Sequence, residues 1–195
     1  MEWILASASP RRKQLLKEVV AQFQIIPAKG EEVCLATESV ESLVKALAMQ
    51  KAREVAALPE AAGKAVLGAD TVVALDGEVL GKPKDEADAT RMLKSLSGRA
   101  HEVYTGVCIS YPVADGRAER IEAACTRVLF ERLTDEQIAA YVATRSPMDK
   151  AGAYGIQDGG LVKRIDGSFS NVVGLPVELC QKMAQEIEKE IEIEK

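Results

Sequence analysis

The segment Ala65–Val73 constrains the fold more than any other part of the chain, because it is almost continuously apolar and contains a single acid, Asp70. An apolar run of this length predicts a β-strand that is buried on both faces of a sheet. Asp70 is then at least partly buried, and an ionised carboxylate there is costly unless a cation or several donors meet it. Asp70 is therefore predicted to be a metal ligand, a base or both; the alternative is an Asp that only ends a strand or turn.

The order of the predicted elements indicates an α/β fold. Strand-like and helical segments alternate in the N-terminal part of the chain, with strands expected at Trp3–Ala6, Phe23–Pro27 and Ala65–Leu75 and helices at Pro10–Val19 and Val40–Leu58. The pairs Asp76-Gly77 and Asp115-Gly116 each lie between strand-like runs and predict hairpin turns, so antiparallel strands must join the parallel ones. The expected architecture is a mixed, twisted central sheet flanked by helices.

Three further helices are predicted in the rest of the chain. One begins at Asp85 and ends before Gly98, one has Thr134 as its N-cap with Gln137 at capping-box spacing, and one covers Pro176–Lys195. No linker, repeat or low-complexity segment divides the sequence. The 195 residues, 47% of them hydrophobic, are expected to form a single domain over residues 1–195, built as one body or as two lobes with a site in the cleft between them.

Charge and cysteine content limit the classes of partner. The formal net charge of −5 and the aromatic content of 4% disfavour a nucleic-acid-binding protein. The sequence shows neither a signal peptide nor an apolar run of membrane-spanning length. Its four cysteines have no Cys-x-x-Cys spacing and are expected to be free thiols, so the predicted location is the reducing cytoplasm.

Two arginines stand at the start of the first predicted helix. Ser9 is a suitable N-cap and Pro10 suits the first helical position, so Arg11 and Arg12 fall in the first turn. Cations there oppose the positive end of the helix dipole unless an anion lies between them and the unpaired backbone N–H groups. The arrangement predicts a phosphate site; the alternative is that both side chains pair with surface carboxylates.

Two lysines are further candidates for phosphate contacts. Lys51 lies on the apolar stripe of the second predicted helix, where it either extends along the surface to reach solvent or reaches into a site. Lys82 lies between Gly81 and Pro83, which restrict its backbone, so its ammonium group can be aimed at a phosphate.

Acidic residues elsewhere in the chain are candidates for metal binding. Glu31 and Glu32 are adjacent in a predicted loop, where one of them could join Asp70 in holding an octahedral cation, or both could belong to a solvated acidic loop. Asp149 and Lys150 could pair with each other at the surface or bridge a metal and a substrate.

Polar side chains near these acids suit a nucleotide base or sugar. Gln157 offers an amide with two donors and one acceptor in a glycine-flanked turn, which matches the edge of a pyrimidine. Thr71 adds a hydroxyl beside Asp70. The single histidine, His101, is predicted to be a polar position on one face of a strand, with no catalytic role.

A series of short motifs extends over almost the whole chain: Ser7-Ala8-Ser9-Pro10-Arg11-Arg12, Gly68-Ala69-Asp70-Thr71, Gly81-Lys82-Pro83, Ser97-Gly98, Thr105-Gly106, Asp149-Lys150-Ala151-Gly152-Ala153-Tyr154-Gly155-Ile156-Gln157 and Asn171-Val172-Val173-Gly174-Leu175-Pro176. In this order they resemble the Maf family. Each motif is weak alone, and the shared order makes the resemblance specific. One departure is the run Asp158–Lys163, which is shorter than the corresponding stretch of the family.

The resemblance implies the fold of Maf proteins and inosine-triphosphatases, and hydrolysis of a nucleoside triphosphate to a monophosphate and pyrophosphate with a divalent cation, Mg²⁺ or Mn²⁺. It implies that Asp70 is catalytic and that Asp70 and Glu32 hold the metal. The implied substrate-binding residues are Ser7, Ser9, Arg11, Arg12, Lys51, Thr71, Lys82 and Gln157, with Asp149 and Lys150 as secondary candidates. Arg12, Thr71 and Gln157 resemble the branch that hydrolyses dTTP and UTP more than the 7-methyl-GTP branch.

Other functions stay open at this stage. A nucleotide-binding regulator of cell division would keep the arginines and Gln157 but would not need Asp70 in a buried strand. A pyrophosphatase for 7-methyl-GTP or for non-canonical purine triphosphates is the nearest enzymatic alternative, and Arg12, Thr71 and Gln157 disfavour it. The expected partner is a nucleoside triphosphate, with no nucleic acid and no membrane, and the sequence is compatible with a homodimer.

Overall fold

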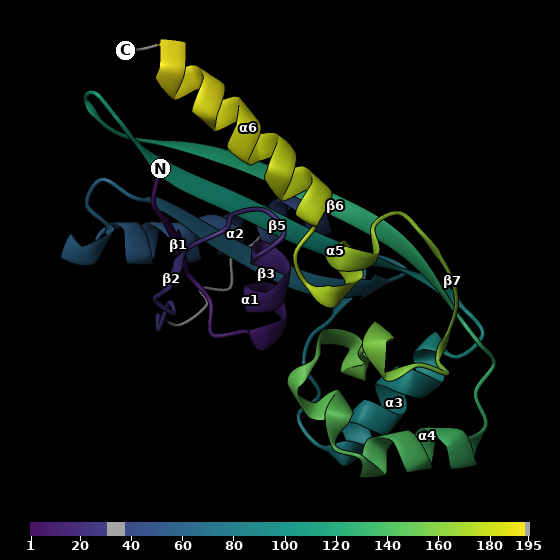
Figure 1. Ribbon diagram of the computed structural model, residues 1–195. Coiled ribbons are helices and arrows are strands. Elements are labelled where there is room, and N and C mark those ends of the chain that lie inside the picture. Colours follow the sequence, from purple (N-terminus) through teal and green to yellow (C-terminus); the bar gives the residue numbers. More distant parts are fainter. Residues whose placement is uncertain (31–37, 194–195) are drawn as a thin grey trace.

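The structure is a computed structural model that describes residues 1–30 and 38–193 (Figure 1). Its strands form one sheet: β1 (Trp3–Leu5), β2 (Gln24–Ile25), β3 (Ala65–Leu75), β4 (Glu78–Leu80), β5 (Ala100–Val113), β6 (Gly116–Phe130) and β7 (Val162–Asp166). The helices are α1 (Pro10–Leu16), α2 (Val40–Ala56), α3 (Glu86–Leu96), α4 (Asp135–Ala143), α5 (Phe169–Val173) and α6 (Val177–Ile193), with short 3₁₀ helices η1 (Pro59–Ala61), η2 (Ser146–Asp149), η3 (Ala151–Ala153) and η4 (Ile156–Asp158).

The sheet is mixed, as predicted, but mostly antiparallel. The strand order is β2-β1-β3-β5-β6-β7, and β4 pairs with β3. β1 runs parallel to β2 and β3, and the other pairings in the described residues are antiparallel. Both predicted hairpins are confirmed: Asp76 and Gly77 have φ of 54° and 83°, which suits a tight turn between β3 and β4, and Val113 pairs with Gly116 at the tip of the β5–β6 hairpin.

Helices cover both faces of the sheet. α6 crosses the long β5–β6 hairpin on one face (Figure 1), where Met183 packs in one cluster with Leu67 and Ile109. α2 packs on the opposite face, where Val55 lies in one cluster with Val66. Because successive residues of a strand point to opposite faces, the alternation along β3 accounts for both contacts.

A second apolar cluster lies at the far end of the long strands. It joins α3, α4 and the short helices η2–η4 to Val73 of β3 and Val103 of β5, and these elements form a smaller body at one end of the sheet (Figure 1). β3 and β5 run through both clusters, since Leu67 and Val107 belong to the one under α6. The arrangement is compatible with two lobes, which stays a prediction.

Three sequence expectations need correction. The first helix ends at Leu16 and not at Val19, because the next amides turn back to carbonyls three residues earlier and tighten the chain. The second strand is shortened to Gln24–Ile25, an exposed strand at the edge of the sheet. His101 is fully buried and is not a polar surface position, because its ring packs edge-on against Phe130 and Tyr154.

Other local predictions are confirmed. Ser9 caps α1 with Pro10 in its first turn, and Asp85 caps α3. Thr134 and Gln137 form a capping box at the start of α4, each side chain accepting the other residue's backbone N–H. None of the helices in the described part of the chain combines the length and apolar character that crossing a bilayer requires.

Candidate active site

One edge of β3, opposite β5, is only partly paired by the strands that the structure describes, and this gap defines the site. On that edge β1 pairs with Ala65–Leu67 and β4 pairs with Val73–Leu75. Among the described residues no strand covers the positions between them. In β3, residues Asp70 to Val73 line a cavity of about 550 Å³, which lies at the point where β1 ends. Such a crevice at the carboxyl end of a parallel strand is a common place for ligands in α/β sheets.

The cavity brings together most of the residues predicted from the sequence. Those that line it are Ser9, Arg11, Arg12, Lys51, Asp70, Thr71, Lys82, Asp149, Lys150 and Gln157. Ser7 supports the site through its hydroxyl, which accepts the backbone N–H of Ser9 at 3.2 Å and Arg12 Nη1 at 3.5 Å. Glu32 lies outside the described residues, so its predicted metal contact is not addressed by the structure.

Two glycines bring Lys51 to Asp70. A Cβ on Gly68 would lie 2.5 Å from the Ala48 carbonyl oxygen of α2, and a Cβ on Gly106 would lie 2.1 Å from the Val44 carbonyl oxygen. Any larger residue at these positions would push α2 away from the sheet. The close approach places the Lys51 ammonium 2.5 Å from Asp70 Oδ1.

Asp70 is buried, as its sequence context predicts, with 7% of its surface exposed. The Lys51 cation offsets the cost of desolvating this carboxylate. The structure therefore resolves the two alternatives for Lys51: its side chain reaches into the site and does not run out to solvent. Both groups of the pair lie at the cavity wall, where a bound phosphate or water can reach them.

Arg12 is held in a fixed orientation. Its Nε donates to the carbonyl oxygen of Gly174 at 2.9 Å, and its Nη2 donates to Thr71 Oγ1 at 3.0 Å. Ser9 Oγ accepts the Arg12 backbone N–H at 3.4 Å, which is the predicted N-cap bond. A guanidinium held by backbone and hydroxyl acceptors keeps its positive charge beside the start of α1, where an anion relieves the conflict with the helix dipole.

Arg11 reaches across the cavity to the opposite wall. Its Nη1 lies 3.2 Å from Asp149 Oδ2, and Lys150 Nζ lies 2.8 Å from Asp149 Oδ1. Partial burial raises the pKa of the Asp149 carboxyl, but the hydrogen bond and charge of Lys150, followed by those of Arg11, outweigh it, so the net pKa lies below its usual value. Asp149 is thus a carboxylate near neutral pH. It pairs with Lys150 and lines the cavity, and its bridging of a metal and a substrate stays a prediction.

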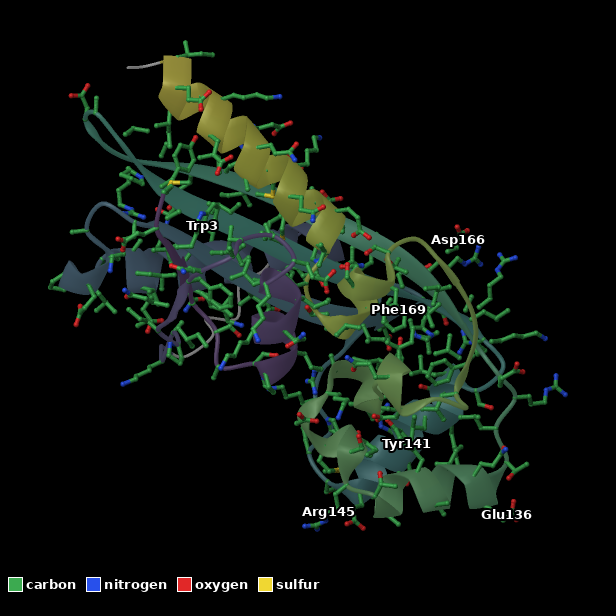
Figure 2. The ribbon with its side chains drawn as sticks, in the orientation of Figure 1. Trp3, Glu136, Tyr141, Arg145, Asp166 and Phe169 are labelled. Carbon is green, nitrogen blue, oxygen red and sulfur yellow. The ribbon has the colours of Figure 1, made fainter. Side chains whose placement is uncertain are left out.

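The wall that carries Gln157 is built around Asp158. Tyr141 and Ser146 donate their hydroxyls to Asp158 Oδ2, each at 2.6 Å, and the Tyr141 oxygen also accepts the Gly155 N–H at 3.0 Å. In Figure 2 Tyr141 lies on the side of α4 that faces the rest of the smaller body. Partial burial raises the pKa of Asp158, but these two hydroxyl hydrogen bonds together with the charges of Lys150 and Arg11 outweigh it, and the net pKa is lowered. The turn that presents Gln157 is therefore fixed from behind.

The sequence analysis missed the residues that hold the predicted substrate-binding side chains in place. Thr105, Asn171 and Gly174 belong to motifs quoted above, yet no role follows from their type alone. The available signal in the sequence is that Asn171 directly precedes the apolar pair Val172-Val173 in the last of these motifs. The structure gives it 0% exposure and hydrogen bonds to two strands.

The residues described here fit a cation that takes most of its ligands from substrate and water. No group of three or more His, Cys, Asp or Glu side chains that could hold a metal occurs within residues 1–30 and 38–193. Asp70 supplies hard carboxylate oxygen at the cavity wall, and Asp149 supplies more on the opposite side. Mg²⁺ is commonly bound through one or two carboxylates plus substrate phosphates, and this donor set suits that mode better than a cage made of protein alone.

A model of the family described as "Maf-like protein" matches residues 2–187. The chain belongs to the Maf family. Among its relatives, a protein from Geobacter sp. (strain M21) named dTTP/UTP pyrophosphatase is 51% identical over 180 residues, which cover 91% of this chain and 90% of the relative. A protein of the same name from Thermococcus gammatolerans is 49% identical over 184 residues, covering 93% and 95%. The family resemblance predicted from the motifs is therefore confirmed.

Solved structures support the fold of this Maf protein. A HAM1 protein from Coxiella burnetii aligns with a TM-score of 0.55 at 16% identity, covering 95% of this chain and 99% of that one. The Ham1 protein of Staphylococcus aureus aligns with a TM-score of 0.54 at 17% identity. At this identity the likeness concerns the fold alone, and it confirms the predicted mixed sheet flanked by helices.

Proposed function

We propose that this protein hydrolyses dTTP and UTP to the nucleoside monophosphate and pyrophosphate. The observation that carries the proposal is the Lys51–Asp70 ion pair, placed in one cavity with Arg11, Arg12 and Lys82. A buried carboxylate beside several cations is the chemistry required for attack on a polyphosphate. The name shared by the relatives, dTTP/UTP pyrophosphatase, supports the same reaction and the same substrates.

The chemical step assigned to Asp70 is the orientation and deprotonation of a water molecule. The attacking oxygen forms a bond to the α-phosphorus while the bond to the α,β-bridging oxygen breaks, so pyrophosphate leaves with that oxygen. Lys51 is near enough to contact both Asp70 and a phosphate at the cavity wall. Arg11, Arg12 and Lys82 neutralise the charge that spreads over the phosphates and the leaving group.

A divalent cation held by Asp70, with Glu32 as the further ligand predicted from the sequence, would polarise the phosphate oxygens and lower the charge on the leaving group. Independently of that cation, Asp149 keeps Arg11 directed toward the cavity. Lys150 is held against Asp149 and the Ser146 carbonyl oxygen, which favours a supporting role for it over a direct phosphate contact.

Selection of the base is assigned to the wall that carries Gln157. Its side-chain amide can donate to and accept from the edge of uracil or thymine. The fixed turn behind it limits how far the amide can move to suit another base. A purine would leave part of this amide unpaired and would have to fit a space bounded by Leu43, Leu47 and Val172.

Hydrolysis in water labelled with ¹⁸O tests the reaction itself. Attack at the α-phosphorus places the label in UMP and leaves pyrophosphate unlabelled, and addition of EDTA stops the reaction until Mg²⁺ or Mn²⁺ is restored. Label in orthophosphate would show attack at the γ-phosphorus and would overturn the proposal. Binding of UTP without any cleavage would instead favour the regulator of cell division.

A substrate of this kind and free thiols at Cys108 and Cys180 support a cytoplasmic location, and a homodimer stays a prediction.

A further inference from the structure

A buried chain of polar side chains runs from the interior of the sheet to Arg12. We call Thr71, Thr105, Asn171 and Thr126 the buried polar chain. The last three are 0% exposed, although each carries hydrogen-bonding groups. Buried polar groups of this kind are costly unless they are paired, so their arrangement is specific.

The sheet register dictates the first link. Thr71 of β3 lies directly opposite Thr105 of β5, and side chains of opposite residues in an antiparallel pair share one face. Their hydroxyl oxygens are 2.9 Å apart. Thr71 Oγ1 also accepts the Arg12 guanidinium at 3.0 Å and lies 3.3 Å from the Gly174 carbonyl oxygen.

Counting protons shows how Thr71 is used. Each hydroxyl has one proton to donate. In the first arrangement Thr105 donates to the Asn171 carbonyl oxygen at 3.3 Å, and Thr71 donates to Thr105. In the second arrangement Thr105 donates to Thr71, and Thr71 donates to the Gly174 carbonyl oxygen. In both arrangements the Thr71 proton is used inside the protein. The Thr71 proton therefore has an acceptor inside the protein and does not need a nucleotide base as its partner.

Asn171 helps to fix another acceptor of Arg12, the Gly174 carbonyl oxygen. Its Nδ2 donates to the Val103 carbonyl oxygen at 3.0 Å and to Thr126 Oγ1 at 2.9 Å, which ties α5 to β5 and β6. α5 ends at Val173, and its C-cap Gly174 has a φ of 130° that few other residues adopt. This turn aims the Gly174 carbonyl at Arg12 Nε.

We propose that Thr105 and Asn171 are positioning residues for Arg12, and that Thr71 contributes to nucleotide recognition through Arg12 and not by contacting the base. The inference rests on the proposed function for the identity of the ligand. The four hydrogen-bonded groups have one effect, which is to set the plane of the guanidinium at the cavity wall. Loss of the Thr71 or Thr105 hydroxyl weakens one of the contacts that hold Arg12 in that plane.

A double-mutant cycle on binding tests this inference. The probe is α,β-imido-dUTP, which binds without turnover, and Kd is measured by calorimetry. In the wild-type background Thr105→Val should raise Kd roughly three- to tenfold, the effect of one lost hydrogen bond. In the Arg12→Ala background the same change should leave Kd unaltered, because its effect passes through the guanidinium. Thr105→Ser keeps the hydroxyl and should restore wild-type affinity.

The control is Ser110→Ala, which removes a buried hydroxyl from the same strand, where it bonds Arg117 away from the cavity. It should lower thermal stability without changing Kd. Equal losses for Thr105→Val in both backgrounds would overturn the inference, since they would show a general structural effect. If Thr105→Val does not fold, Thr71→Val at the cavity end of the chain replaces it in the same cycle. An effect of Thr71→Val that persists without Arg12 would mean direct contact with the base and would also overturn it.

The proposed function can fail separately. Absence of pyrophosphate release by the wild type, together with intact coupling between Thr105 and Arg12 on binding, would contradict the reaction and leave the positioning network standing.

Discussion

At the scale of single residues, the pairing of Asp70 with Lys51 at 2.5 Å carries the chemistry. Asp70→Asn keeps the shape of the side chain but can neither accept a proton nor carry a negative charge. We expect kcat for dTTP to fall by roughly 10²–10⁴-fold, the range that a positioned general base contributes. The measurement is steady-state pyrophosphate release.

Binding provides the control for Asp70→Asn. Affinity for α,β-imido-dUTP should persist, because Arg11, Arg12 and Lys82 still line the cavity. A variant that keeps more than about a tenth of the wild-type kcat would remove Asp70 from the role of base.

A second prediction at this scale separates the two walls of the cavity. Gln157→Ala should narrow the preference for UTP over GTP by roughly ten- to a hundredfold while changing the rate with UTP less, because its amide meets only the base. Arg11→Ala should lower kcat/KM for every triphosphate by a similar factor, because it acts on phosphates that all substrates share. The ratio of kcat/KM values for UTP and GTP in both variants is the test, and a loss of preference in Arg11→Ala would contradict the assignment.

Residue types predicted part of this site and not the rest. Charged residues in unfavourable places, such as Asp70 in an apolar strand and Arg12 at a helix start, indicate function because their cost requires a partner. Thr105 and Asn171 are uncharged, and their roles depend on which strands and helices they join. Only the register of β3 against β5 shows that Thr71 and Thr105 meet.

At the scale of elements, the close packing of α2 on the sheet positions Lys51. Gly106→Ala would place a Cβ 2.1 Å from a backbone carbonyl that has no rotamer with which to move away. We expect unfolding free energy to fall by about 1–3 kcal/mol, the usual cost of overpacking, and kcat to fall because Lys51 shifts relative to Asp70. Chemical denaturation and pyrophosphate release measure the two effects.

Gly77→Ala is the matched control for this prediction. It lies in the β3–β4 turn with φ of 83° and open space around it, so it costs backbone strain without displacing α2. It should lower stability by about 1 kcal/mol and leave kcat unchanged. An active Gly106→Ala enzyme of wild-type stability would show that α2 does not need this close approach.

Elements were predictable where a local signal decides them. Ser9, Asp85 and Thr134 cap their helices as their residue types indicate, and the Asp-Gly turns form hairpins. The end of α1 was not predictable, because no Gly or Pro marks it in the sequence and the change to tighter turns after Leu16 is seen only in the hydrogen bonds. The extent of antiparallel pairing was also missed, since strand direction depends on partners far away in the sequence.

At the scale of the whole molecule, we expect a single buried histidine to dominate the pH dependence of stability between neutral and mildly acidic pH. His101 is fully buried beside Tyr154, with its Nε2 2.8 Å from the Tyr154 hydroxyl, and burial lowers its pKa from 6.5 to about 4. The unfolded chain therefore binds more protons than the folded protein between these two values. The contribution of the neutral ring is complete above pH 6.5 and is lost as pH falls towards 4.

We expect unfolding free energy to fall by roughly 2 kcal/mol between about pH 7.5 and about pH 5 because of this one group. The chain contains one histidine, so few other side chains titrate in this range. His101→Phe should flatten the pH dependence, whereas Tyr154→Phe removes the hydrogen bond but keeps the ring and should retain it. Urea denaturation at a series of pH values is the measurement, and an unchanged slope in His101→Phe would contradict the account.

The assembly of the cavity is the feature that no local pattern could predict. Arg11 and Asp149 are distant in sequence yet form an ion pair at 3.2 Å, and the two apolar clusters that hold them share β3 and β5. The family motifs predict that these residues act together, because they occur in a fixed order. The structure adds the physical reason, which is the edge of β3 that no strand of the described residues covers between β1 and β4.

The most direct test of the central claim is a comparison of kcat/KM for dTTP, UTP, ATP, GTP and 7-methyl-GTP with the purified protein in Mg²⁺, with separate detection of pyrophosphate and orthophosphate. We expect dTTP and UTP to be preferred by roughly ten- to a hundredfold for each contact that a wrong base leaves unmet, with pyrophosphate as the product. Preference for 7-methyl-GTP or a purine triphosphate, or release of orthophosphate from dTTP, would contradict the account.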